Sequence, residues 1–117
     1  MYNFPLIVKG NDILKRIFPA KQKAVAQILE LLKDNEKIDR IIIFGSAVTL
    51  NCGTYSDVDV AIEADISTDE FLKVAHILYV NVDSEVDVIH YNTIRSELLK
   101  QEIDSKGVEV YVADKNK

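Results

Sequence analysis

A short run of apolar residues, Ile41 to Phe44, is followed directly by Gly45 and Ser46. Because β-branched and aromatic side chains favour extended backbone, the run predicts a strand over residues 39–44, and the glycine predicts its end. The run has no polar interruption, whereas a strand with one solvated face would alternate. It therefore predicts a central strand that is buried on both faces.

Three further strands and three helices are predicted along the chain, after an irregular lead-in over residues 1–19. Ser67 and Glu70 form a capping box that opens the second helix. Asn92 is expected to cap the third helix, and Gly107 suits the position just after that helix ends. Apolar residues at spacings of three, four and seven define the first helix. The helices are expected over 20–35, from 67, and over 92–107; the strands over 39–44, 57–62, 85–89 and 108–112.

The positions of the acidic residues decide between two sheet topologies. In a doubly wound parallel sheet, ligands collect beyond the carboxyl ends of the strands. Here Gly45 and Ser46 end the first strand, whereas Asp57 and Asp59 begin the second. For all four residues to serve one site, the second strand must run antiparallel to the first. We therefore predict an α+β fold: one domain over residues 1–117, with a mixed sheet of about four strands and helices mainly on one face.

Composition limits the classes of partner. The chain has 117 residues, 19 of them Asp or Glu against 14 Lys or Arg, for a net charge of −5. This balance argues against direct nucleic-acid binding, which depends on clustered basic residues, but it allows an enzyme acting on a metal-bound nucleotide. The single cysteine indicates a reducing compartment, and no apolar run is long enough to span a membrane. We expect a cytoplasmic protein.

Three carboxylates are the candidate metal ligands. Side chains two residues apart on a strand share a face, so Asp57 and Asp59 point the same way, roughly 6–7 Å apart along the backbone. Asp87 lies between two valines of a later strand and leaves it on the face opposite them. If these strands are neighbours, the three carboxylates meet on one surface. Oxygen ligands together with substrate phosphates are what Mg²⁺ prefers.

Gly45 and Ser46 are the candidate phosphate-binding residues. Glycine allows close backbone approach at a sharp turn, and a serine hydroxyl with free backbone N–H groups can hold phosphate oxygens. An Asp-x-Asp pair alone is more often a turn or a solvated strand edge. Asp59 and Asp87, however, lie inside apolar strands, where a carboxylate is costly unless it is paired or bound to metal. The combination favours a functional site.

One pattern of residues resembles the minimal nucleotidyltransferases of the DNA polymerase beta superfamily, including MNT-type antitoxins. The pattern is Gly45-Ser46, ten intervening residues, the Asp57–Asp59 pair and then Asp87. The resemblance covers almost the whole chain and implies a polymerase beta palm-like fold. It implies that the three aspartates are catalytic and bind two Mg²⁺ ions, with Gly45 and Ser46 holding the triphosphate. The implied reaction transfers a nucleoside monophosphate from a nucleoside triphosphate, ATP in the first instance, to an acceptor hydroxyl. The implied partner is a HEPN-type toxin that would be adenylylated.

The sequence departs from this family at one point. Members often carry arginines just after Gly-Ser, whereas Ala47, Val48 and Thr49 follow here. The alternative is therefore a non-catalytic antitoxin module that neutralises its partner by docking. A receiver-like phospho-acceptor is disfavoured because its acids would end strands. Two residues after Asp87 have open roles: Tyr91 is expected to pack, with stacking on a base as the alternative, and His90 is a weaker candidate for the site.

Overall fold

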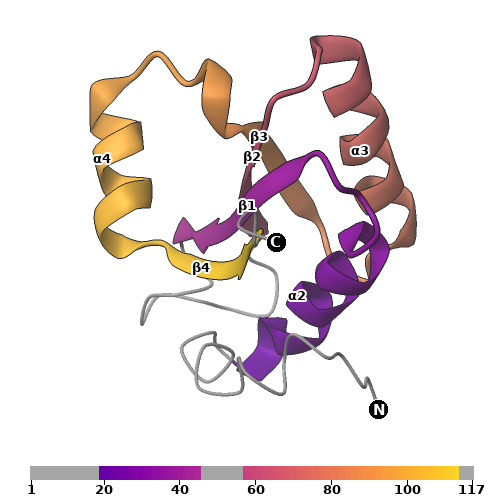
Figure 1. Cartoon of the computed structure of the whole chain (residues 1–117). Coiled ribbons are helices and arrows are strands. Elements are labelled where there is room, and N and C mark those ends of the chain that lie inside the picture. Colours follow the sequence, from indigo (N-terminus) through magenta and orange to yellow (C-terminus); the bar gives the residue numbers. More distant parts are fainter. Residues whose placement is uncertain (1–18, 46–56, 114–117) are drawn as a thin grey trace.

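The computed structural model describes residues 19–45 and 57–113. Within them, four strands form one sheet in the order β3-β2-β1-β4 (Figure 1). The bounds are Ile38–Phe44 for β1, Val58–Ala64 for β2, Val86–His90 for β3 and Val108–Val112 for β4. Most of the expected lead-in, the expected helical turn and loop over 46–56, and Ser46 itself lie outside the described residues.

Strand directions confirm the mixed sheet. Strand β2 runs antiparallel to β1 and parallel to β3, while β4 runs antiparallel to β1 on the other side. The apolar run of β1 is central as predicted, and Ile41 to Phe44 are all buried. The antiparallel pairing brings the end of β1 to the beginning of β2, which is the arrangement that the glycine and the aspartates require.

Three helices cover the sheet: α2 (Pro19–Leu32), α3 (Thr68–Asn81) and α4 (Glu97–Lys106). Helix α3 begins as predicted, because the hydroxyl of Ser67 accepts a hydrogen bond from the backbone N–H of Glu70 at 3.2 Å. Helices α2 and α3 share one face of the sheet and α4 lies on the other (Figure 1). The fold is thus α+β, with two of the three described helices on one face.

The predicted cap of α4 is wrong. Ser96 caps the helix, accepting from the backbone N–H of Leu99 at 3.2 Å. Asn92 instead lies in a short 3-10 turn, η2 (Tyr91–Thr93), and its side-chain oxygen accepts from the backbone N–H of Ala64 at 3.0 Å. Serine and asparagine are equally good N-cap residues. Because the side chain of Asn92 is used in its hydrogen bond to β2, Ser96 is the residue left to cap the helix.

Gly107 ends α4 as predicted, but its backbone has φ −68°, which any residue adopts. Glycine is favoured at this position because there is no room for a side chain. A Cβ at this position would overlap the carbonyl oxygen of Ile103 and the side chain of Ile42. Glycine therefore lets the end of α4 pack closely against β1.

Candidate functional site

Asp59 and Asp87 lie side by side on the sheet face that carries α4. Val58 and Val60 belong to the core beneath α2 and α3, so alternation along β2 places Asp59 on the opposite face. The same alternation around Asp87 places it on that face too, and the strand register pairs the two aspartates directly. Asp57, exposed, comes just before β2.

Gly45 approaches Asp59, one member of this pair, from the end of β1. Its φ is +71°, the left-handed region that favours glycine. Phe44 pairs with Asp59 across β1 and β2, and a Cβ on Gly45 would overlap Asp59 Oδ2 and lie 3.1 Å from its Cγ. The turn after β1 thus approaches the carboxylate closely enough that only glycine fits.

The electrostatics of the site are unfavourable in the protein alone. Burial raises the pKa of Asp59 above its usual value, and repulsion from Asp87, Asp57 and Glu102 raises it further. Among the described residues, none of the ion pairs involves Asp57, Asp59 or Asp87. In the part of the chain that the structure describes, negative charge is therefore gathered here without an ion-paired cation.

The described side chains do not form a preassembled cage. Within residues 19–45 and 57–113, no group of three acidic, histidine or cysteine side chains is arranged to hold a metal ion. The structure brings Asp59 and Asp87 together and leaves Asp57 beside them at the start of β2. Carboxylate oxygens on such a surface are the ligand type of a cation that completes its shell with water or phosphate.

Among the residues that the structure describes, Glu102 is a charged neighbour of the site that the sequence did not indicate. It lies on α4 and contributes to the raised pKa of Asp59. From the sequence, Glu102 could be placed on a predicted helix but not near the aspartates. That helix approaches β2 only through the tertiary fold. Within the described ranges, Glu102 therefore joins Asp57, Asp59 and Asp87 as an acidic group at this end.

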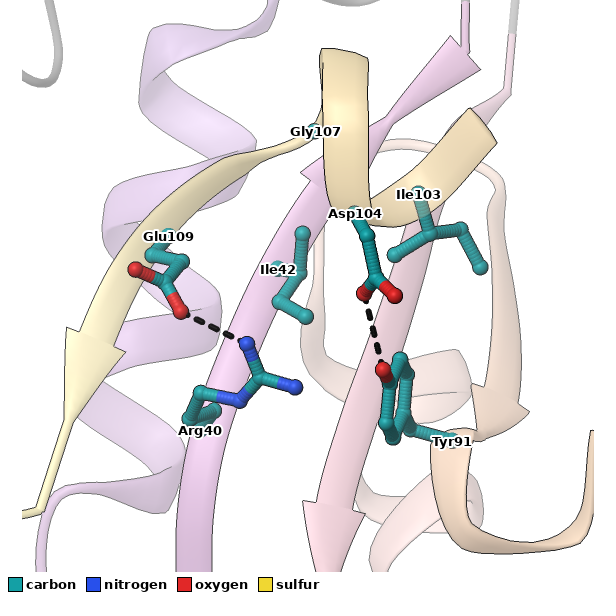
Figure 2. Close-up of a pocket in the computed structure, with 7 residues that line it drawn as sticks. All are labelled: Arg40, Ile42, Tyr91, Ile103, Asp104, Gly107 and Glu109. Atoms are coloured by element: carbon teal, nitrogen blue, oxygen red, sulfur yellow. Dashed lines mark hydrogen bonds and ion pairs between the residues drawn. The ribbon is translucent and has the colours of Figure 1, made fainter. Parts of the chain in front are cut away.

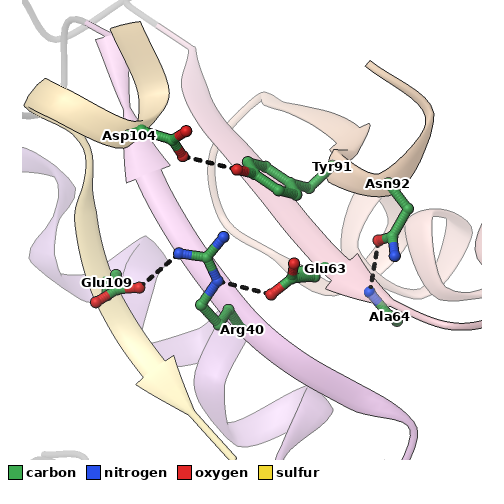
Figure 3. A network of polar contacts seen from close by, with 7 residues as sticks. All are labelled: Arg40, Glu63, Ala64, Tyr91, Asn92, Asp104 and Glu109. Carbon is green, nitrogen blue, oxygen red and sulfur yellow. Dashed lines mark hydrogen bonds and ion pairs between the residues drawn. The ribbon is translucent and has the colours of Figure 1, made fainter. Parts of the chain in front are cut away.

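A second charged cluster lies further along the same face (Figure 3). Arg40 donates through Nε to Glu63 and through Nη1 to Glu109, each at 2.7 Å. Its guanidinium carbon lies 4.9 Å from the ring centroid of Tyr91, whose hydroxyl donates to Asp104 at 2.8 Å. Burial alone would lower the pKa of Arg40, but its hydrogen bonds to Glu63 and Glu109 outweigh this effect and raise it.

This cluster borders a pocket of about 500 Å³ between α4, β1 and β4 (Figure 2). Its floor and walls mix a cation, carboxylates and apolar side chains. The lining residues are Arg40, Ile42, Tyr91, Ile103, Asp104, Gly107 and Glu109. The volume lies within the range of small-molecule sites.

Of the two residues with open roles, His90 faces away from the acidic group. Its ring stacks on Phe71 of α3 with centroids 4.7 Å apart, and its Nε2 lies 2.8 Å from the carbonyl oxygen of Ala64. Strand alternation explains this, since His90 is an odd number of residues from Asp87. Tyr91 is buried and packs as expected, and it also borders the pocket.

The sheet order, the paired aspartates and the glycine that ends β1 define the class of a nucleotidyltransferase domain. The sequence model of the family "Polymerase beta, Nucleotidyltransferase" matches residues 26–116. This chain belongs to that family. No helix in the described ranges has the length and apolar character needed to cross a bilayer.

Solved structures give a more particular likeness. A Shewanella oneidensis complex of a tri-AMPylated HEPN toxin with its MNT antitoxin matches at 28% identity and a TM-score of 0.60, over 80% of this chain and 73% of that one. A toxin–antitoxin crystal structure with AMP-PNP matches at 27% identity with a TM-score of 0.63, and the match covers 75% of this chain and 73% of that one. The crystal structure of the toxin–antitoxin MntA–HepT matches at 26% identity with a TM-score of 0.59, and the match covers 79% of this chain and 73% of that one. A search of curated proteins gave no match.

Proposed function

We propose that this chain is a Mg²⁺-dependent nucleotidyltransferase that moves a nucleoside monophosphate, AMP in the first instance, from a nucleoside triphosphate to an acceptor hydroxyl. The observation that carries the proposal is the direct pairing of Asp59 with Asp87 beside Gly45, on one face of the sheet. It occurs in a chain that belongs to a nucleotidyltransferase family.

The residues fit Mg²⁺ in the kind of ligand they offer. Asp57, Asp59 and Asp87 offer oxygen donors, and the repulsion that raises the pKa of Asp59 is relieved when a divalent cation neutralises the group. Two ions are proposed, and Asp57, Asp59 and Asp87 would be the residues that hold them. Bound Mg²⁺ would orient the triphosphate and offset charge on the leaving pyrophosphate.

The chain's own groups would then do three things. Gly45, together with Ser46 from the segment outside the described residues, holds phosphate oxygens at the end of β1. Asp87 accepts the proton of the acceptor hydroxyl as its oxygen attacks the α-phosphorus. The new oxygen–phosphorus bond forms while the bond to the β-phosphate oxygen breaks, and pyrophosphate leaves with the electron pair.

The acceptor proposed here is a hydroxyl of a HEPN-type toxin, and the location proposed is the cytoplasm. Support comes from the matched complex, in which a tri-AMPylated HEPN toxin is bound by an MNT antitoxin. The described part of the chain has no second domain to recognise an acceptor, because its residues are used in a single sheet and its covering helices. A partner protein can supply that surface.

A second candidate function is a docking antitoxin without catalysis. The observation in its favour is the sequence after Gly45 and Ser46, where Ala47, Val48 and Thr49 offer no cation to the triphosphate. The two functions separate cleanly by experiment, because docking does not need the carboxylates.

The test is a transfer assay with α-labelled ATP, Mg²⁺ and a purified HEPN-type toxin. We expect label to move to the toxin, and the double change Asp57→Asn with Asp59→Asn to reduce the transfer rate about a thousandfold or more. The matched control is Asp65→Asn, an exposed aspartate just beyond the other end of β2. Toxin binding without transfer, and unaffected by the double change, would establish the docking function instead.

A further inference from the structure

The last residue of β2, Ala64, is held by two side chains from the end of β3 and from the turn η2 that follows it. The side-chain oxygen of Asn92 accepts from the backbone N–H of Ala64 at 3.0 Å (Figure 3). Nε2 of His90 lies 2.8 Å from the carbonyl oxygen of Ala64, and because a carbonyl can only accept, this nitrogen donates. His90 is buried and stacked on Phe71, which fixes its ring. We call these two contacts the Ala64 clamp.

Asn92 continues the hydrogen-bond ladder between β2 and β3 beyond the point where the backbone leaves it. Val58 donates its backbone N–H to the carbonyl of Glu85 at 2.9 Å, and Ala64, an even number of residues later, points its N–H to the same side. The carbonyl of Tyr91 is turned into η2, where it accepts from the N–H of the residue that caps this turn at 3.2 Å. The side chain of Asn92 therefore supplies the acceptor on the β3 side of Ala64.

Apolar packing alone does not fix the register of β3. In the described sheet, β3 is an edge strand with β2 as its neighbour. Val86 and Val88 belong to the core that α2 and α3 cover, so a slip by one residue would turn Asp87 into that core. A slip by two residues keeps the same faces but moves Asp87 roughly 6–7 Å along the strand from Asp59. A polar contact at a defined position can exclude this second slip.

The paired aspartates also oppose the strand pairing that they depend on. Asp59 and Asp87 lie directly opposite each other, and like charges in that arrangement destabilise a strand pair. The Ala64 clamp lies five residues along β2 from Asp59, roughly 16–17 Å away, so it acts on this pair only through the two strands. It can hold β3 against the repulsion without occupying the site.

We propose that Asn92 is a positioning residue of the carboxylate site, and that together with His90 it holds β3 in the register that places Asp87 opposite Asp59. The inference rests on the proposed function, because it takes these carboxylates to hold Mg²⁺ and the triphosphate. It adds what that function leaves open: how an edge strand keeps two like charges paired before a cation binds.

The first test is amide hydrogen exchange of the full chain without metal or nucleotide. The backbone N–H groups of Asp87 and Ile89 point towards β2, because that of Val88 between them points to the hydroxyl of Tyr79. Their exchange, measured relative to the amides of β1, reports the opening of β3. We expect Asn92→Ala to speed this exchange about three- to tenfold, as the loss of one hydrogen bond implies.

The second test is the transfer assay, read as kcat and as the KM for ATP. Because misplaced reacting groups slow the chemical step, Asn92→Ala should lower kcat about tenfold and leave KM within about twofold. Asn92→Asp keeps an acceptor oxygen and is expected to restore kcat and the exchange rate. His90→Phe keeps a stacked ring but removes the donor to Ala64, and should resemble Asn92→Ala in both measurements.

Ser67→Ala is the matched control. It also removes one hydrogen bond from a backbone N–H to a side-chain oxygen, but at the start of α3. It is expected to keep the wild-type kcat and the wild-type exchange of β3 relative to β1, even though it lowers overall stability.

A wild-type kcat in Asn92→Ala would overturn the positioning role, whatever the exchange rates, and would leave the Ala64 clamp as a contribution to stability alone. Unchanged exchange of β3, or the same losses in Ser67→Ala, would overturn it as well. A wild-type chain that transfers no label would remove the proposed function and this role together. That result is distinct from the others, because they require an active wild type or need no ligand at all.

Discussion

The sheet face beneath α4 carries charge at both ends, and the two ends balance it differently. At the Arg40 end, one guanidinium is held by Glu63 and Glu109 at 2.7 Å each. At the Gly45 end, Asp59 lies beside Asp87, neither is ion-paired within residues 19–45 and 57–113, and the pKa of Asp59 is raised. We call the first the balanced end and the second the unbalanced end. The comparison separates a structural ion-pair network from a carboxylate surface for which we propose a cation.

Gly45→Ala tests the unbalanced end with the largest expected loss of stability. The substitution forces a left-handed backbone on alanine and drives its Cβ into Asp59. Together these effects are expected to lower the free energy of unfolding by about 2–4 kcal/mol in urea denaturation.

Gly107→Ala is the matched control, because it is also crowded but has an ordinary φ. Both variants should lose stability. Only Gly45→Ala should also weaken Mg²⁺-dependent ATP binding, since only it displaces Asp59. Equal ATP binding by the two variants would show that the approach of Gly45 to Asp59 has no bearing on the site.

Arg40→Met tests the balanced end. It leaves Glu63 and Glu109 without their cation in a partly buried setting, and we expect a loss of roughly 1–3 kcal/mol in the free energy of unfolding. Adding Glu63→Gln should restore part of that loss, because the unpaired carboxylate is then removed. A double variant as unstable as the sum of both single variants would contradict the pairing.

Tyr91→Phe should have a smaller effect at the same end. It removes the hydroxyl that donates to Asp104 at 2.8 Å but keeps the ring under Arg40. The expected loss is about 0.5–1.5 kcal/mol, the usual net value of one hydrogen bond. A thermal melt unchanged by the substitution would mean that water replaces the bond without cost.

The pH dependence of stability should show the smallest effect, and it tests the unbalanced end alone. Burial, and then repulsion from Asp87, Asp57 and Glu102, raise the folded-state pKa of Asp59 above 3.8. The folded state therefore binds this proton more tightly than the unfolded state does, and stability falls as pH rises from below 3.8 through the folded pKa.

The measurement is the metal-free free energy of unfolding of wild type relative to Asp59→Asn. We expect wild type to lose stability relative to the variant as the pH rises through that window, and Mg²⁺ to return part of the loss at neutral pH. A difference that does not change with pH would show that Asp59 is not destabilised in the folded state.

Much of the fold follows from local patterns. The unbroken apolar run of β1 predicted a central strand, and the positions of Gly45 and Asp59 predicted an antiparallel β2; both are confirmed. The placement of Asp59 and Asp87 on one face followed from alternation within each strand. Their direct pairing depends on strand order, which no local pattern encodes.

The features that sequence reasoning missed are all long-range. Arg40 and Glu109 are separated by 69 positions, and nothing near either residue indicates the other. Ser96 rather than Asn92 caps α4, because Asn92 reaches across to β2. Glu102 approaches Asp59 only through the packing of α4 over the sheet. The roles proposed for Asp57, Asp59, Asp87, Gly45 and Ser46 stay predictions until ligand binding is measured.

The most direct measurement is a calorimetric titration of Mg²⁺ and ATP into the wild-type chain and into a double variant carrying Asp57→Asn and Asp59→Asn. The wild type should give a saturable heat that requires both Mg²⁺ and ATP, while the folded double variant should give none. Identical heats from the two proteins would show that the unbalanced carboxylates are not the metal site.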